Sequence, residues 1–137
     1  MTPSTPSVRA VVARYAEATA DNRVFFHPDI PEHRLASALT AYPGIAPEGV
    51  LVLLDNTDSG DATEGLLLTG DVLHVSSGPD EKQELDIRDL RSAGLTHQPS
   101  GTIMINRMPV LTELRVRPGT MRHVVAMLNE LATASRA

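Results

Sequence analysis

The sequence predicts an α+β, mainly β domain in which about seven short antiparallel strands form a barrel capped by a C-terminal helix, behind two short helices. Residues 65–75 hold two apolar runs joined by Gly70-Asp71, a pattern typical of a hairpin. Further short apolar runs separated by polar turns continue as far as residue 117. A helical pattern then closes the chain, and the apolar stripe of such a helix can cover one open end of a barrel.

Two amphipathic helices are expected before any strong strand. Apolar residues recur on one stripe over 8–20 and again from about 29 to 42. The second helix is expected to begin near Asp29, because Asp29 and Glu32 have the spacing of a capping box. The segment 23–29 between the helices is expected to be extended or irregular, since the residue before a proline is pushed away from helical geometry.

From residue 49 onwards the pattern changes to short strands. They are expected over residues 50–54, 66–69, 72–76, 85–90, 92–97, 102–105 and 109–117. The last of them alternates most clearly, with one face made by Val110, Thr112, Leu114 and Val116. A closing helix over 120–132 is expected to pack on the barrel through an apolar stripe made by Met121, Val124, Leu128 and Leu131.

Size and charge restrict the class of protein. The chain has 137 residues, enough for one domain with a sizeable core, and a formal net charge of −5. Residues 50–90 carry ten acidic and two basic residues, hence −8, whereas residues 91–137 carry six basic and two acidic ones, hence +4. The acidic middle argues against a general nucleic-acid or anionic-membrane surface, while the basic C-terminal third leaves room for one local anionic contact.

The domain organisation and location follow from composition. Residues 1–7 are polar and proline-rich, which predicts a flexible tail, and they lack the pattern of a signal peptide. We expect a helical prefix over 8–48 and the barrel with its capping helix over 49–134, together one compact domain. No apolar stretch has the length of a transmembrane segment, and no cysteine is present, so we expect a cytoplasmic protein.

The order of elements resembles the pleckstrin-homology (PH) superfold, especially bacterial PH-like and GRAM-like domains. The resembling residues are 64–75, Glu-Gly-Leu-Leu-Leu-Thr-Gly-Asp-Val-Leu-His-Val, which look like the second and third strands of those domains. The turn at 103–106 and the closing helix match in place, and residues 29–57 look like the helical prefix of one bacterial group. The resemblance implies a domain that binds phosphoinositides, peptides or proteins, or serves as a scaffold. The loop in which PH domains carry basic residues is acidic here, so a multiply charged phosphate would be repelled.

No motif for reaction chemistry stands out. The loop 55–61 carries several carboxylates and could hold a divalent ion, so a small enzyme or metal-binding protein that uses this Asp-rich loop stays an alternative. The loop does not fit the calcium-binding EF-hand pattern, and a solvated acidic turn explains it as well. The five histidines lack metal-ligand spacing. We therefore expect no enzyme activity, no cofactor and no resident metal.

The function expected is a non-enzymatic interaction or scaffold module that binds a protein partner or associates with itself. An alternative is a domain that binds an anionic lipid or a phosphate ligand; nucleic acid is not expected as a partner. The residues that could receive a carboxylate or phosphate of a partner are Arg107, Arg115, Arg117 and Arg122. Apolar residues on which a partner or a second copy could dock are Phe25, Phe26 and Ile30. Alternatively, the two phenylalanines are buried against the barrel, and the partner surface then lies elsewhere.

Overall fold

The computed structural model describes residues 8–19, 21–70, 72–78, 81–96 and 101–135. Three α-helices lie in this part of the chain: α1 (Val8–Ala18), α2 (Glu32–Ala41) and α3 (Pro118–Ser135). The strands are β1 (Val24–Phe26), β2 (Val52–Asp55), β3 (Gly65–Leu68), β4 (Val72–Ser76), β5 (Lys82–Asp86), β6 (Ala93–Thr96), β7 (Thr102–Ile105) and β8 (Met108–Thr112). Two short 3-10 helices are η1 (Pro47–Gly49) and η2 (Ile87–Asp89).

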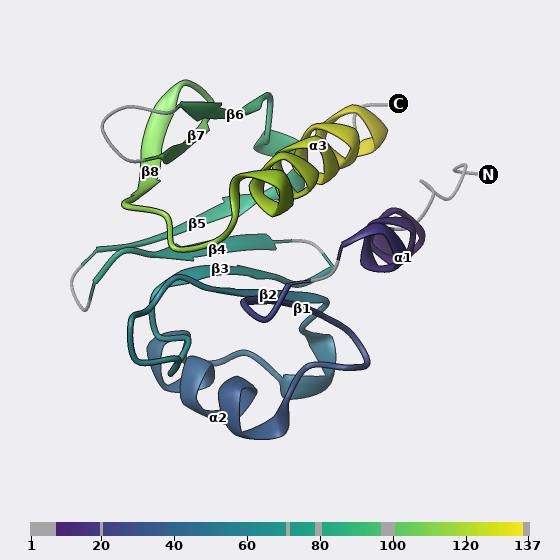
Figure 1. The fold of residues 1–137 in the computed structure, drawn as a ribbon. Coiled ribbons are helices and arrows are strands. Elements are labelled where there is room, and N and C mark those ends of the chain that lie inside the picture. The colour runs from purple at the N-terminus through teal and green to yellow at the C-terminus, as the bar shows by residue number, and fades with distance from the viewer. Residues whose placement is uncertain (1–7, 20, 71, 79–80, 97–100, 136–137) are drawn as a thin grey trace.

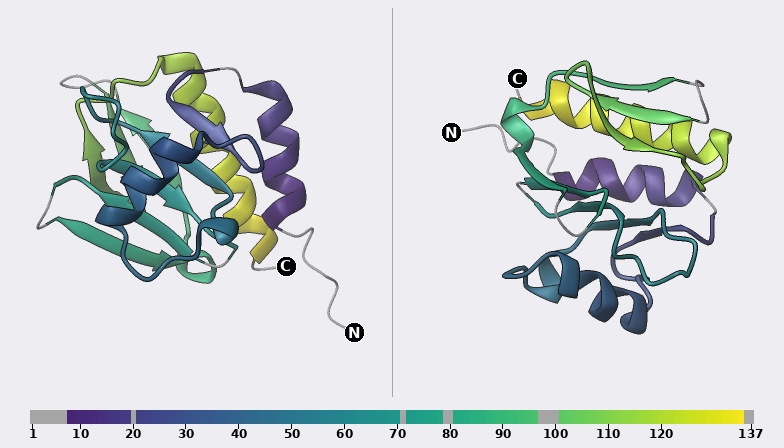
Figure 2. Two further views of the ribbon diagram at one scale, coloured as in Figure 1. Left: turned by 90° about the horizontal axis from the view of Figure 1, so that it is seen from below. Right: turned by 90° about the vertical axis from the view of Figure 1, so that its left-hand side faces the viewer.

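The strands form two antiparallel sheets that are stacked with the helices in layers. One sheet has the order β1-β2-β3-β4-β5 and the other the order β6-β7-β8. In Figure 1, α2 lies on one face of the larger sheet, and α1 and α3 lie on its other face. The side view in Figure 2 shows α3 between α1 and the smaller sheet. The predicted α+β class, with antiparallel strands and a closing helix, is thereby confirmed.

The expected single barrel is replaced by these two sheets. Within the described residues no hydrogen-bonded strand pair joins one sheet to the other. Two local features separate them. The prefix supplies β1, which pairs with β2 and extends the larger sheet at that edge. After β5 the chain turns through η2, where the Asp86 side chain accepts a hydrogen bond from the backbone N–H of Arg88, and this turn leads the chain away to β6.

Two apolar cores cover both faces of the larger sheet, which explains why β2 and β3 are apolar without alternation. The main core fills the space between this sheet, α1, α3 and the smaller sheet. The second core lies between α2 and the other face of the sheet, with Ala38 and Tyr42 packed against Leu53 and Leu67. Residues of the prefix over 8–48 thus contribute to both cores.

Three element boundaries differ from the expectation. The helix α2 begins at Glu32 with Pro31 at its N-cap and no side-chain cap, so the predicted capping box is wrong; Asp29 closes a turn onto the Phe26 carbonyl instead. The strand expected over 85–90 is shifted towards the N-terminus: β5 starts at Lys82 and ends at Asp86, and η2 follows it. The strand β8 ends at Thr112, because Glu113 adopts a φ of 50° that no extended strand can continue. The expected alternation over 109–117 therefore does not persist.

The packing of α3 allows a direct test of the main core. Leu128 is 1% exposed, and its neighbours on the expected stripe, Met121, Val124 and Leu131, are as well buried. Leu128→Ala is expected to lower the free energy of unfolding by about 2–5 kcal/mol, because it leaves a cavity in the core. Urea denaturation measures this loss. The exposed Arg122 on the same helix is the control, and Arg122→Ala should change stability by no more than about 0.5 kcal/mol.

Candidate functional site

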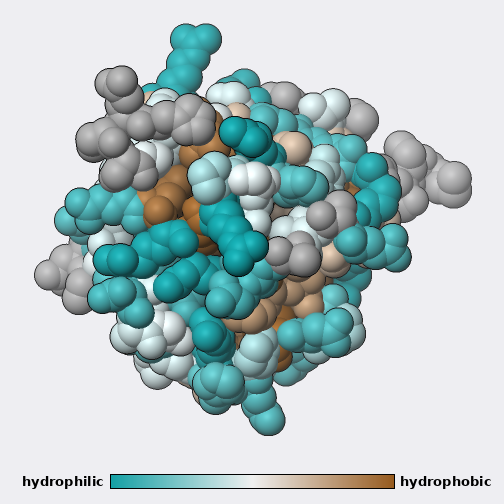
Figure 3. Space-filling view, in the orientation of Figure 1, coloured by the Kyte–Doolittle hydropathy of each residue, from teal (hydrophilic) through white to brown (hydrophobic). Residues whose placement is uncertain are grey.

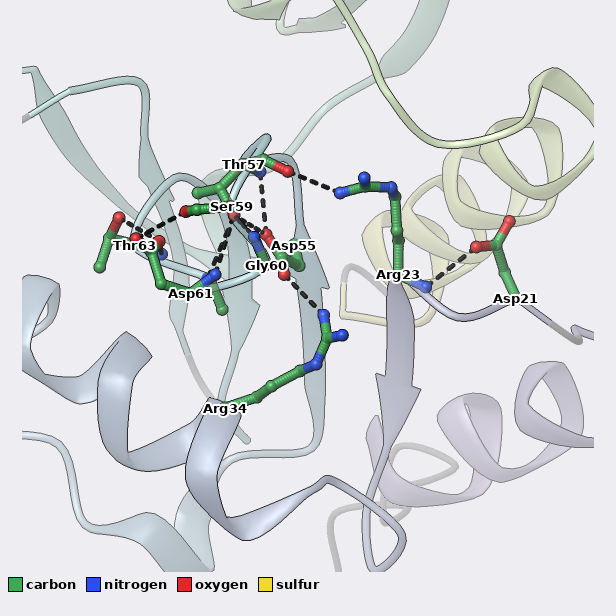
Figure 4. A network of polar contacts seen from close by, with 10 residues as sticks. Asp21, Arg23, Arg34, Asp55, Thr57, Ser59, Gly60, Asp61 and Thr63 are labelled. Atoms are coloured by element: carbon green, nitrogen blue, oxygen red, sulfur yellow. Dashed lines mark hydrogen bonds and ion pairs between the residues drawn. The ribbon is translucent and has the colours of Figure 1, made fainter.

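The loop over residues 56–64, here called the acidic loop, is fixed by a buried carboxylate at the end of β2. Asp55 is fully buried, and its Oδ2 accepts a hydrogen bond from Arg34 Nη1 of α2 at 2.7 Å. Its Oδ1 accepts from the backbone N–H and the hydroxyl of Thr57. Arg23 Nη1 donates to the Thr57 carbonyl at 2.6 Å. Figure 4 shows these side chains converging on the start of the loop from β1, β2 and α2.

A second carboxylate closes the acidic loop at its far end. Asp61 Oδ1 accepts from the backbone N–H and the hydroxyl of Thr63, and Oδ2 accepts from the Ser59 hydroxyl. The hydrogen bonds from the Thr63 hydroxyl and N–H, with that from Ser59, lower the pKa of Asp61. The carboxylates of Asp55 and Asp61 are therefore occupied by donors of the chain itself. In the described residues no group of three or more His, Cys, Asp or Glu side chains is arranged to hold a metal ion.

A polar cleft of about 450 Å³ lies between the acidic loop and the end of β8. Asn56 bridges its two walls, since its Oδ1 accepts from the Arg115 N–H at 2.8 Å and its Nδ2 donates to the Thr112 carbonyl at 3.4 Å. Arg115 Nη1 lies 3.5 Å from Asp58 Oδ1. The guanidinium of Arg115, which lines the cleft, thus already has the carboxylate of Asp58 beside it.

The structure does not bring the four predicted arginines together. Arg107 lies in the turn between β7 and β8, whereas Arg115 and Arg117 follow the other end of β8. A five-residue strand separates these ends by roughly 17 Å at about 3.3 Å per residue. Arg117 and Arg122 are exposed near the start of α3. A site for an anion could therefore include only Arg115, Arg117 and Arg122, without Arg107.

The three predicted docking residues contribute to packing within the domain. Phe26 is 7% exposed and belongs to the main core. Ile30 is partly buried against the second core. Phe25 is partly buried, and the guanidinium of Arg34 lies 5.0 Å from the centre of its ring. Little of this surface is left for a partner.

A different apolar surface lies where the two sheets approach each other without pairing. A groove of about 180 Å³, here called the inter-sheet groove, runs between the hairpin β4–β5 and the hairpin β7–β8. Its lining residues are Leu73, Val75, Gln83, Glu84, Leu85, Ile105, Asn106, Met108 and Val110. Figure 3 shows an apolar area on the face where β5 and β8 lie, with hydrophilic residues around it. Met108, at 64% exposed, is the one large hydrophobic side chain that is exposed among the described residues.

Hydrogen bonds hold one wall of the inter-sheet groove in place. Asn106, in the turn between β7 and β8, accepts at its Oδ1 from the N–H groups of Arg91 and Ser92 at 2.7 and 3.1 Å. Its Nδ2 donates to the Asp89 carbonyl at 2.9 Å. The hairpin that carries Met108 is thereby fastened to the end of η2 and to the segment that follows it.

A histidine lies on the opposite face of β4. His74 makes an edge-to-face contact with Tyr42, with ring centres 6.0 Å apart, and its Nδ1 lies 3.9 Å from Glu84 Oε2. Burial lowers the pKa of His74, and the Glu84 carboxylate opposes this effect by raising it. The imidazole thus contacts Tyr42, which follows α2 and belongs to the second core.

This environment predicts a pH dependence of stability. The folded state binds the His74 proton more weakly than the unfolded state, whose histidine pKa is about 6.5. The contribution of His74 to stability is therefore present above about pH 6.5 and is lost as the pH falls below that value. When the pH is lowered from about 7.5 to 5, the free energy of unfolding should fall further in the unchanged protein than in the His74→Gln variant. Denaturation at both pH values tests this; an equal loss in both proteins would contradict it.

The sequence patterns did not single out the inter-sheet groove. Met108 precedes Pro109 directly after a turn, and an isolated methionine in that position gives no sign of exposure. The buried position of Asp55 has a weak signal, since it continues the apolar run 50–54 without a break. A buried acid needs a cation, but the sequence does not say which of the arginines supplies it.

Comparison with known proteins gives no relationship: no protein family, no curated protein and no solved structure was found to match this chain. In the described residues no helix combines the length and the apolar character needed to cross a membrane.

Proposed function

We propose that the protein is a non-enzymatic interaction module of PH-like type that binds a protein partner at the inter-sheet groove. The observation that carries the proposal is the exposed Met108 beside a preformed apolar groove at the side where the two sheets do not pair. Met108 continues the apolar lining of the groove, and an apolar area that is rimmed by polar residues is typical of a site of protein association. Methionine is well suited to such a site because its flexible, polarisable side chain adapts to different contacts.

The size of the groove favours a protein over a small molecule. Pockets for drug-sized ligands and cofactors enclose about 300–1,000 Å³. The inter-sheet groove, with about 180 Å³, has room for side chains of a partner that covers it from outside. The larger polar cleft offers less to such a ligand. Its arginine is placed beside Asp58, and the Asp61 carboxylate on its wall is used by Thr63 and Ser59.

The PH-like part of the proposal is supported by the order of elements. An acidic loop follows the strand β2, further antiparallel strands in two sheets follow, and the helix α3 closes the domain. This order agrees with the resemblance of residues 64–75 to PH-like strands. Several PH-like domains bind peptides or proteins, and the resemblance alone does not choose among those uses.

The competing lipid function would need the three arginines near the start of α3. Asp58 lies beside Arg115, and the acidic loop lies on the same cleft, so an anionic surface would be repelled there. We expect little sedimentation of the protein with vesicles of anionic lipid. Strong salt-sensitive binding that is lost in Arg115→Glu with Arg117→Glu would replace the proposed function with lipid binding.

Site-specific photo-crosslinking tests protein binding directly. A photo-reactive phenylalanine at position 108 is expected to give a discrete protein adduct in cells that produce the chain. The same group at Glu17, which is exposed on α1, is the control and should give no such adduct. Excess unmodified protein should compete with the reaction, whereas Met108→Asp should not. Absence of a competed adduct at position 108, or the same adduct at position 17, would contradict the proposal.

A further inference from the structure

We infer that two copies of this chain associate through the edges of their β5 strands, which pair antiparallel about a twofold axis at Gln83. The inference goes beyond the proposed function, because it concerns an edge of the larger sheet and not the partner that occupies the inter-sheet groove. The occupant of the edge is a second copy, since the alternating charges of β5 complement those of their own copy in this register.

The backbone of β5 presents hydrogen-bonding groups at this edge that β4 does not use. Ser77 donates its N–H to the Glu81 carbonyl at 2.9 Å, which places the pair 77/81 among the hydrogen-bonded pairs of the β4–β5 ladder. Because such pairs alternate along an antiparallel ladder, Gln83 and Leu85 bond to β4, while Lys82 and Glu84 direct N–H and C=O away from it. In the part of the chain that the structure describes, no other strand pairs with this edge.

The other sheet edges are less suited to strand pairing. The opposite edge of the larger sheet, β1, has only three residues. In the smaller sheet, β8 contains Pro109, which lacks an N–H, and β6 is joined to α3 by both amide hydrogen bonds of Asn129 to Ala93. The strand β5 has five residues, no proline and exposed side chains from Lys82 to Glu84.

A twofold axis at Gln83 brings opposite charges together. In this register Lys82 of each copy faces Glu84 of the other, so two such pairs form, one on either side of the axis. Both residues direct their backbone groups outwards, so the same pairs exchange the hydrogen bonds of the new ladder. Both side chains are exposed, Glu84 to 65%, and can reach a neighbour. Opposite charges that face each other across strands are stabilising.

Neighbouring registers bring like charges together. An axis at Lys82 would place two lysines opposite each other, and an axis at Glu84 two glutamates. Moving the axis one residue further would bring Glu84 opposite Asp86. With the axis at Gln83, Asp86 would face Asp80, which lies outside the described residues, but Arg88 Nη2 lies 3.0 Å from Asp86 Oδ2 and offsets that charge.

The charges of β5 do not simply guard the edge against pairing. Natural edge strands are protected by charged side chains, above all by lysines. Here Lys82 is followed by Glu84 at the next position on the same face, so an antiparallel copy supplies the opposite charge for each of them. A foreign strand would need charges in the matching order, whereas every copy of this chain carries them.

Sedimentation equilibrium over a range of protein concentrations measures the association. Only strand edges meet, so we expect a reversible dimer of modest affinity. Lys82→Glu and Glu84→Lys each give both facing pairs the same sign and should weaken the dimer about tenfold. The double variant restores opposite pairs and should dimerise as the unchanged chain does. An equimolar mixture of the two single variants should form mixed dimers. Glu17→Lys, on α1, makes the same charge change as Glu84→Lys and should have no effect.

A cysteine at the axis tests the register, and the natural chain has no cysteine that could interfere. Gln83 and its copy would form a non-hydrogen-bonded pair with Cα atoms about 4.5 Å apart, within the range that a disulfide spans. Gln83→Cys should therefore give a disulfide-linked dimer in a glutathione buffer. Glu81→Cys is the matched control: the side chain is exposed on the same face, but it would lie opposite Leu85 and should not form the bond.

Four results would overturn the inference: a monomer at every concentration, a dimer that neither single charge variant weakens, no recovery in the double variant, or a disulfide that forms as readily from position 81 as from position 83. Failure of the proposed function is read separately. Crosslinking at position 108 to a protein other than this chain can succeed in a monomer, and a β5 dimer can form when that crosslinking fails.

Discussion

Replacing Gly65 with alanine is expected to lower the free energy of unfolding by roughly 3 kcal/mol or more, or to prevent folding. Gly65 begins β3 with a φ of +140°, a conformation that residues with a side chain rarely adopt. A Cβ at this position would lie 2.0 Å from the Leu54 carbonyl oxygen and 3.2 Å from the Asn56 nitrogen. Because these are backbone atoms of the paired strand β2 and of the residue that follows it, no change of rotamer relieves the overlap.

Gly70 in the following turn is the matched control. No atom lies within 4 Å of the position that a Cβ would take there, and its φ is outside the range that disfavours side chains. Gly70→Ala should therefore be neutral, or stabilising by about 0.4–1 kcal/mol through the unfolded chain. Urea denaturation of both variants measures the difference. Equal stability of the two proteins would show that the chain at Gly65 relaxes without cost.

The elements of this fold were predictable where local pattern and burial agree. The hairpin of β3 and β4 was expected from apolar runs on both sides of Gly70-Asp71, and its pairing is observed, although Asp71 itself lies outside the described residues. The apolar stripe of α3 was predictable because the core on which it packs lies on one side of the helix. Propensity and tertiary contacts favour the same conformation in both elements.

Other features depend on contacts that no local pattern encodes. Residues 24–26 form a strand because β2 offers them an edge, and Val24 pairs with Leu54 about thirty positions away in the sequence. Separation of the strands into two sheets depends on the turn at η2, which the strand-like run 85–90 conceals. The groove results from this separation, so a reading that expects a closed barrel cannot place a site there. The exposure of Met108 was missed for the same reason.

Asp55→Ala should have an effect as large as that of the glycine substitution, and for an electrostatic reason. The carboxylate is fully buried, and it accepts hydrogen bonds from Arg34 and from the backbone and hydroxyl of Thr57. Alanine would leave these donors without their acceptor, with the guanidinium held against Phe25 and only 25% exposed. Removing one partner of a buried pair costs about 3–5 kcal/mol. We expect a loss near the lower end of this range, because the Arg34 charge that remains is only partly buried.

Substitution of Asp58, in the acidic loop itself, is the control: it removes the same charge as Asp55→Ala but from an exposed position. The side chain of Asp58 is 87% exposed and lies 3.5 Å from Arg115. Asp58→Ala removes the same charge, yet it should change stability by no more than about 1 kcal/mol, since water and salt screen an exposed pair. Asp55→Asn, which keeps one acceptor oxygen, should fall between the two in urea denaturation. If Asp55→Ala were no more destabilising than Asp58→Ala, the carboxylate at the end of β2 would not be what fixes the acidic loop, and its other contacts, such as the hydrogen bonds of Asn56 and Asp61 and the packing of Ala62, would suffice to hold it.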